Sequence, residues 1–198
     1  MKQINIKRDR GNVTFETVSI DVTENVFFTN LDPQEAHWPT LATNQLGAAP
    51  SPNSSQCTVP TPADLNPPNN VVSYGCQIKG HGNEKGVINV FAQLAAADDT
   101  TLADATKGQP ITEQQVVVGG MSPYAITGQL FQVTDAGGNV IKSGSGIGPN
   151  LQLNATTDSN GIWVTGTPTL SGTYNFTFTV NDAMGKNLQQ VQYSMKVA

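Results

Sequence analysis

The chain has 198 residues, and only 13% of them are charged, against roughly 25% in typical soluble domains. Its 10 basic and 15 acidic side chains give a net charge of −5 at pH 7, which excludes the basic surface that nucleic acids or anionic membranes require. Nineteen glycines, 12 prolines and short hydrophobic runs are typical of a β-rich protein with many turns, and they exclude a helical bundle.

Alternating apolar residues predict short strands from the start of the chain. In the first half these strands lie at 4–6, 13–22, 26–28, 71–78 and 87–94. Residues 42–70 are rich in Pro, Asn, Ser and Gly, so we expect long loops there around at most one short strand near Cys57. Residues 95–110 are small and acidic and lack alternation, which predicts a connection between two domains.

The second half returns to the strand pattern. Predicted strands lie at 116–118, 130–133, 140–141, 151–153, 161–164, 172–180 and 191–197, and the turn at 135–139 predicts a hairpin. Strands at this spacing, joined by turns rich in Gly and Asn, are typical of a β-sandwich. The sequence therefore predicts an all-β chain of two tandem Greek-key β-sandwiches, with a domain at 1–96, a linker at 97–110 and a domain at 111–198.

A motif in the second half resembles a known family. The segment 151–185 reads LQLNATTDSNGIWVTGTPTLSGTYNFTFTVNDAMG, with Gly166-Thr-Pro168, Gly172-Thr-Tyr174 and Asn181-Asp182 at its characteristic positions. It resembles the immunoglobulin-like repeats of bacterial surface proteins. The resemblance implies an immunoglobulin-like fold for the second domain and a role as a spacer or interaction module, although such folds host unrelated activities.

Three residues in the first half have the chemistry of a metal site. His37 follows one predicted strand, Cys76 ends another, and His81 lies in the Gly-rich loop after it; these are both histidines of the chain and one of its two cysteines. Two imidazoles and a thiolate form the ligand set of a blue copper site, which often has a weak axial group. We therefore expect His37, Cys76 and His81 to bind one copper ion, with Glu84 as a candidate weak axial ligand.

The sequence around these residues is similar to the cupredoxins, over residues 2–94. VFFTN precedes His37, Tyr74-Gly-Cys76 opens the loop to His81, and Gly86-Val-Ile-Asn-Val90 follows it, with the Cys-to-His spacing of azurin and phytocyanin loops. The resemblance implies a cupredoxin-like fold, a copper ion at the three ligands and single-electron exchange with a redox partner protein.

The first half also departs from the cupredoxin pattern. No methionine stands where the family has its axial ligand, and Glu84 occupies that part of the loop. Trp38-Pro39 replaces the small polar residue that follows the first histidine in the family. The resemblance therefore predicts a site without the usual axial ligand, and it does not predict the usual hydrogen bonding to the thiolate.

Cys57 gives Cys76 a different candidate partner. A Cys57–Cys76 disulfide would stabilise a small exported domain by about 2–4 kcal/mol, and it would exclude copper because copper needs the thiolate. The alternative function is then a copper-free cell-surface or extracellular interaction module with a degenerate cupredoxin fold, whose partners are other surface domains. No hydrolase, P-loop or zinc-protease motif occurs in the sequence, so we do not expect an enzyme under either hypothesis.

The expected location is outside the cytoplasm. No stretch of the sequence is long and apolar enough to insert into a membrane, and the first residues lack the apolar core of a signal peptide. The low charge with abundant Thr, Asn and Gly favours a periplasmic, secreted or cell-surface protein whose signal peptide has been removed.

Overall fold

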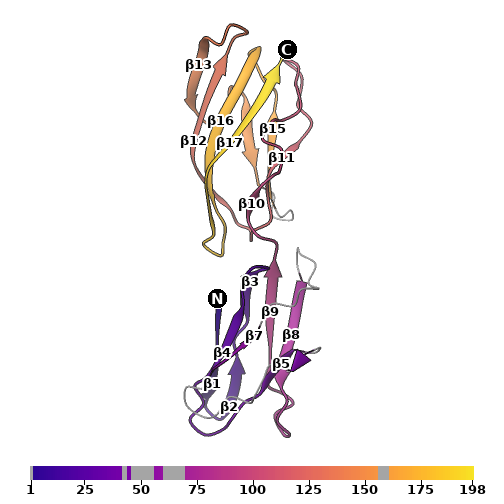
Figure 1. Cartoon of the computed structure of the whole chain (residues 1–198), viewed down its shortest axis with the longest axis vertical. Helices are drawn as coiled ribbons and strands as arrows, with labels where there is room; N and C mark the ends of the chain where they lie inside the picture. Colours follow the sequence, from indigo (N-terminus) through magenta and orange to yellow (C-terminus); the bar gives the residue numbers. More distant parts are fainter. Residues whose placement is uncertain (1, 42–43, 46–55, 60–69, 156–160) are drawn as a thin grey trace. The chain divides into compact units, whose positions relative to one another are not determined.

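The computed structural model describes residues 2–41, 44–45, 56–59, 70–155 and 161–198. Every regular element within these residues is a β-strand, so the predicted all-β class is confirmed. Among them there is no helix whose length and apolar character would carry it through a lipid bilayer. The chain divides into two units, Met1–Ala92 and Gln93–Ala198, and each is a β-sandwich (Figure 1).

The first unit consists of two sheets of mixed strand direction. One sheet has the order β2 (Asn12–Phe15), β1 (Lys2–Asp9), β4 (Val26–Asn30) and β7 (Gln56–Val59). The other has the order β3 (Val18–Asp21), β9 (Lys85–Phe91), β8 (Asn70–Cys76), β5 (Pro39–Leu41) and β6 (Asn44–Gln45). The pairs β1–β4 and β3–β9 are parallel, whereas the other neighbours are antiparallel. Strand β7 confirms the predicted short strand near Cys57.

The core of the first unit lies between its two sheets. Alternate residues of a strand point to opposite faces, so Ile4 and Ile6 of β1 are both fully buried. Tyr74 of β8 donates from its hydroxyl to the carbonyl of Glu16 at 2.6 Å, which anchors the strand that ends in Cys76. The core consists of Ile4, Ile6, Phe15, Val18, Ile20, Val26, Phe28, Tyr74, Ile88 and Val90.

The second unit also has two sheets. One has the order β10 (Ala95–Ala96), β11 (Gln114–Val118), β15 (Gly161–Gly166) and β14 (Leu151–Asn154). The other has the order β13 (Val140–Ser145), β12 (Ala125–Thr134), β16 (Gly172–Asn181) and β17 (Asn187–Val197). The amide of Asp135 donates to the carbonyl of Asn139 at 2.9 Å between β12 and β13, which confirms the predicted hairpin.

An aromatic cluster fills the core of the second unit. Tyr174, Phe176 and Phe178 occupy alternate positions of β16, and all three are buried. Phe176, Phe178 and Tyr193 stack on one another with ring centroids 6.1–6.4 Å apart. The alternating apolar residues that predict this strand from the sequence are therefore the residues that fill the core.

The predicted linker at 97–110 is part of the second unit. The amide of Leu102 donates to the carbonyl of Ser194 at 2.8 Å, and the amide of Ala105 donates to that of Lys196 at 2.8 Å. Leu102 is buried in the aromatic core. The sequence shows no alternation here because the segment pairs with β17 only at isolated bridges, and its other side chain packed against the core is the small Ala105. The division falls between Ala92 and Gln93 rather than at 96.

Candidate metal centre

A tight loop joins β8 to β9 and carries His81 and Glu84, while Cys76 is the last residue of β8 before it. The amide of Cys76 donates to the carbonyl of Glu84 at 3.0 Å, which closes the loop at its base. Inside the loop, the amide of His81 donates to the carbonyl of Ile78 at 3.0 Å, and Gly80 has a φ of +97°. Turns of this kind need a residue that tolerates positive φ. The turn returns His81 toward the end of β8.

The loop that follows β4 supplies His37. Asn30, the buried last residue of β4, shapes this loop with both ends of its side-chain amide. Its Oδ1 accepts from the amide of Asp32 at 2.9 Å, and its Nδ2 donates to the carbonyl of Glu35 at 2.9 Å. The side chain of Asn30 thus fixes the path of the chain from β4 to His37.

Strand pairing brings the two loops together. Pro39 on β5 is paired in register with Cys76 on β8, so His37 lies beside the end of β8. One ligand atom from each of His37, Cys76, His81 and Glu84 lies within 4.8 Å of the other three. The structure therefore brings together all four residues that the sequence indicates, and their binding of a metal ion stays a prediction.

The donor atoms lie at or slightly below the spacing that a four-coordinate ion needs. Ligand atoms about 2.0–2.3 Å from a tetrahedral metal ion stand about 3.3–3.8 Å apart. Cys76 Sγ lies 3.5 Å from His81 Nδ1. Glu84 Oε2 lies 2.9 Å from His37 Nδ1 and 3.1 Å from His81 Nδ1. The side chain of His37 is fully buried, while those of His81 and Glu84 are 16% and 13% exposed, so the donors are largely shielded from water.

Cys76 has a free, partly buried thiol. Burial raises the pKa of this thiol above its usual value, and the carboxylate of Glu84 adds to the shift. The backbone amide of Trp38 donates to Cys76 Sγ at 3.3 Å. The indole side chain at position 38 does not remove this hydrogen bond, because the donor is the main-chain N–H that every residue except proline carries.

Glu84 lies among the donors rather than at their edge. The sequence predicts a weak axial ligand, whereas the structure places Oε2 within hydrogen-bond distance of both Nδ1 atoms, those of His37 and His81. The carboxylate is therefore closer to both imidazoles than two ligands of a shared tetrahedral ion stand to each other, so it would move slightly outward on binding an ion. The candidate donor set is two nitrogens, one sulfur and one oxygen.

A second group of side chains lies behind the histidines, and the sequence patterns did not indicate it. Arg8 Nε and Nη2 lie 3.0 and 2.7 Å from the two carboxylate oxygens of Asp32, and Nη2 lies 2.6 Å from Glu35 Oε2. Asp32 Oδ2 lies 2.8 Å from His37 Nε2. The guanidinium of Arg8 holds the pKa of the fully buried Asp32 carboxyl well below its usual range.

One feature of the sequence could have identified Arg8. Ile4 and Ile6 are buried on β1. A period of two then places residue 8 on the same inward face of the strand. A charged residue at such a position needs a partner of opposite charge. The partner, Asp32, cannot be read from the sequence because it depends on the loop conformation after β4.

The alternative disulfide involves a side chain outside the described residues. The backbone of Cys57 lies in β7, opposite Phe28 of β4 in the first sheet. Cys76 ends β8 in the other sheet and is a free thiol. The Cys57–Cys76 disulfide therefore stays a prediction.

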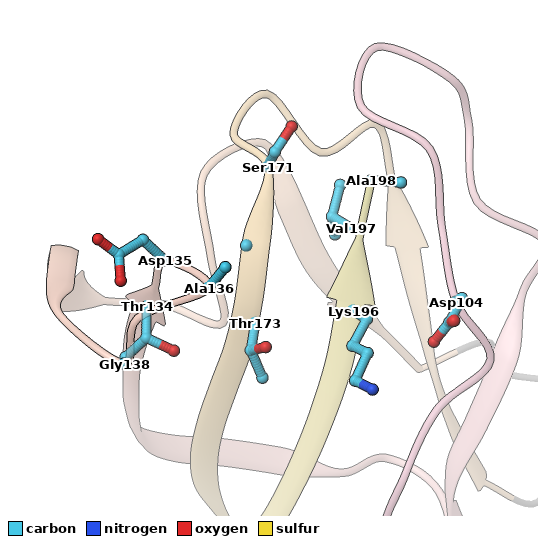
Figure 2. A pocket seen from close by; sticks show the side chains of 11 residues that line it. Asp104, Thr134, Asp135, Ala136, Gly138, Ser171, Thr173, Lys196, Val197 and Ala198 are labelled. Carbon is cyan, nitrogen blue, oxygen red and sulfur yellow. The ribbon is translucent and has the colours of Figure 1, made fainter.

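The second unit has a hollow of about 780 Å³ beside the ends of β16 and β17. Figure 2 shows Asp135 at one side of it and Asp104 at the other, with Lys196 nearer to Asp104. The Asp135 carboxylate already accepts hydrogen bonds from the amides of Gly137 and Asn139 in its own turn. The hollow thus lacks the converging polar groups of a ligand site.

No protein family matches this sequence, and no curated protein sequence is significantly similar to it. Solved structures of similar fold include a titin structure, with 11% identity, a TM-score of 0.43 and coverage of 100% of this chain and 96% of that one. SporoSAG from Toxoplasma gondii has 14% identity and a TM-score of 0.46, with coverage of 93% and 96%. Sidekick-1 immunoglobulin domains 1–4 have 9% identity and a TM-score of 0.40, with coverage of 92% and 46%.

These likenesses concern the fold alone, because all three identities are low. The TM-scores are low as well, so these likenesses carry no argument about either unit. The second unit is a β-sandwich by its own sheet topology, and the immunoglobulin-like and cupredoxin resemblances stay predictions.

Proposed function

We propose that this chain is an extracytoplasmic interaction protein whose first unit holds one copper ion. The observation that carries the metal site is the convergence of His37, Cys76, His81 and Glu84, with all four ligand atoms within 4.8 Å of one another. The donors come from two separate loops, so the local sequence of one loop does not account for their meeting. The proposed role is binding rather than catalysis.

The contact between His37 and Glu84 supports a cation at this place. His37 Nε2 lies 2.8 Å from the carboxylate of Asp32, which fixes a proton on that nitrogen. In a neutral imidazole the other nitrogen, Nδ1, is then an acceptor, yet it lies 2.9 Å from Glu84 Oε2, which is also an acceptor. Two acceptors at this distance need a proton or a metal ion between them.

The chemistry of the donors supports copper and a preferred oxidation state. A thiolate with two imidazoles suits copper, and Cys76 and Glu84 together bring two negative charges that balance Cu(II). Cu(I) in the same site would leave one negative charge uncompensated in a shielded environment. We therefore propose that the site holds Cu(II) more tightly than Cu(I), so that its reduction potential is low for an electron-transfer protein.

The second unit is proposed to contact other surface domains. Its immunoglobulin-like class supports this role, and it favours the interaction-module hypothesis over electron transfer as the function of the whole chain. The second candidate function is a copper-free interaction module with a Cys57–Cys76 disulfide. The free thiol of Cys76, whose sulfur faces His81 and the amide of Trp38, favours the copper site over that disulfide.

A thiol count followed by a copper titration separates the two candidates. Unreduced, metal-free full-length protein is expected to have two free thiols, and then to bind one Cu(II) per chain with an intense thiolate-to-copper absorption in the visible. Cys76→Ser abolishes this absorption, and the matched variant Cys57→Ser retains it. A count of zero thiols favours the copper-free module, and a protein with free Cys76 that binds no Cu(II) contradicts the copper site.

A further inference from the structure

Both histidines of the proposed site have a carboxylate on each side. Their Nδ1 atoms face Glu84 Oε2, at 2.9 Å for His37 and 3.1 Å for His81. Their Nε2 atoms face outward, where His37 Nε2 lies 2.8 Å from Asp32 Oδ2 and His81 Nε2 lies 3.7 Å, at ion-pair distance, from Glu35 Oε2. Both imidazoles thus have a metal-facing nitrogen and an outward nitrogen, but only His37 is hydrogen-bonded to its outer carboxylate.

Arg8 joins the two outer carboxylates. Its Nη2 lies 2.7 Å from Asp32 Oδ2 and 2.6 Å from Glu35 Oε2, and its Nε lies 3.0 Å from Asp32 Oδ1. The Asp32 carboxylate is fully buried, so it needs a charged partner. A planar guanidinium that contacts both oxygens of a carboxylate fixes its orientation as well as its charge. One side chain thus sets the position of both carboxylates.

We propose, resting on the proposed copper site, that Arg8 is a positioning residue that orients the imidazole of His37 through Asp32. The hydrogen bond to Asp32 keeps the proton of His37 on Nε2. Nδ1 is then the nitrogen of His37 whose lone pair is directed at the ion. Hydrogen bonds of this kind to metal-binding histidines set the tautomer and the ring orientation, and their loss commonly lowers metal affinity about 10–100-fold.

The first test needs no metal. In the metal-free protein, side-chain ¹⁵N NMR is expected to show a protonated Nε2 on His37. Arg8→Met is expected to shift part of the His37 population to the tautomer with a proton on Nδ1. The control Lys7→Met changes the neighbouring basic residue of β1, which pairs with Glu16, and is expected to leave the histidine signals unchanged. An unprotonated Nε2 in the wild type overturns the proposal, as does an Arg8→Met spectrum identical to that of the wild type.

A second variant covers the case in which Arg8→Met does not fold. Arg8→Lys keeps the positive charge beside Asp32 but lacks the planar fork that contacts both of its oxygens. It is expected to shift part of the His37 population to the other tautomer, whereas the control Glu35→Gln, at a residue that is 49% exposed, is expected to leave His37 as in the wild type. A His37 signal that is the same in Arg8→Lys and in the wild type contradicts the proposal.

The third test measures copper. Arg8→Met is expected to lower the affinity for Cu(II) about 10–100-fold and to alter the copper hyperfine splitting in the EPR spectrum, whereas Lys7→Met changes neither. A purely structural role of Arg8 would lower the melting temperature but leave the spectrum of the bound ion intact. If the wild type binds no Cu(II), the proposed copper site fails, and the NMR result still decides whether Arg8 positions the imidazole of His37.

Discussion

The backbone amide of Trp38 donates a hydrogen bond to the sulfur of Cys76 at 3.3 Å, across 38 positions of the sequence. This bond joins the loop that carries His37 to the strand end that carries Cys76. The indole of Trp38 has no part in it, and its buried Nε1 lacks a hydrogen-bond partner within the described part of the chain. The main chain and the side chain of this residue therefore have separate effects on the site.

We expect Trp38→Phe to retain the copper site at little cost in stability. The substitution removes a buried unpaired N–H, which costs about 1–3 kcal/mol in the wild type, and this gain offsets the loss of buried ring surface. The free energy of unfolding in urea is expected to stay within about 1 kcal/mol of the wild type. The thiolate-to-copper absorption is expected to persist. Loss of that absorption in a folded variant would show that the indole itself supports the thiolate.

Glu84→Met is expected to raise the reduction potential of bound copper. A carboxylate stabilises Cu(II), and a thioether is a softer, uncharged donor that suits Cu(I). A tenfold rise in the ratio of Cu(I) to Cu(II) affinity corresponds to about 59 mV for a one-electron couple, and protein-film voltammetry can detect a change of this size. Glu84→Gln, which removes the charge but keeps an oxygen, is the matched control and should lie between the two. A potential that is the same in all three proteins excludes Glu84 as a ligand.

Gly86→Ala is expected to destabilise the first unit. Gly86 on β9 is paired in register with Tyr74 on β8, and an added Cβ would overlap the buried Tyr74 ring. Forcing extra volume into a packed core typically costs about 1–3 kcal/mol, which chemical unfolding can measure. Gly82→Ala is the control, because a Cβ there meets no atom within 4 Å. Equal stability of the two variants contradicts the packing described for Tyr74.

Because of its four tyrosines, the folded protein is expected to lose stability at alkaline pH. Burial raises the pKa of Tyr124 to about 12 and also raises those of Tyr74, Tyr174 and Tyr193. A group whose pKa is higher in the folded than in the unfolded chain contributes its full stabilisation at pH values below its unfolded-state pKa, which is about 10 for tyrosine. The contribution is lost as the pH rises toward the folded-state pKa. The free energy of unfolding should therefore fall as the pH rises above about 10.

Ultraviolet titration of tyrosinate checks this expectation. The native protein should show little ionisation near the ordinary tyrosine pKa, and the protein unfolded in urea should ionise there in full. A native titration curve that coincides with the unfolded one would contradict the burial of these rings.

The residues that the sequence identifies and those it misses differ in what determines their position. Cys76 ends a strand, and His37 and His81 lie in the loops that follow predicted strands, so a strand pattern and the ligand chemistry of each side chain suffice to predict that they meet. Asp32 and Glu35 reach the histidines only because the Asn30 side chain bends the loop after β4. Loop conformation of this kind depends on tertiary contacts that a single sequence does not contain.

The same distinction applies to the fold. The aromatic strand β16 is predicted because its period of two is unbroken over ten residues. Residues 97–110 show no period, although Leu102 is buried and its amide pairs with Ser194. A segment that contacts the core through one large side chain and several main-chain bonds has no sequence pattern to detect.

The parallel bridges between the start and the end of the second unit have a mechanical consequence. Thr101 pairs with Ser194, and Ala105 pairs with Val197, in the same chain direction. A force that pulls the unit apart by its two ends slides these segments past each other, so that their hydrogen bonds resist together instead of opening one after another. We therefore expect the second unit to resist extension when it is pulled by its two ends.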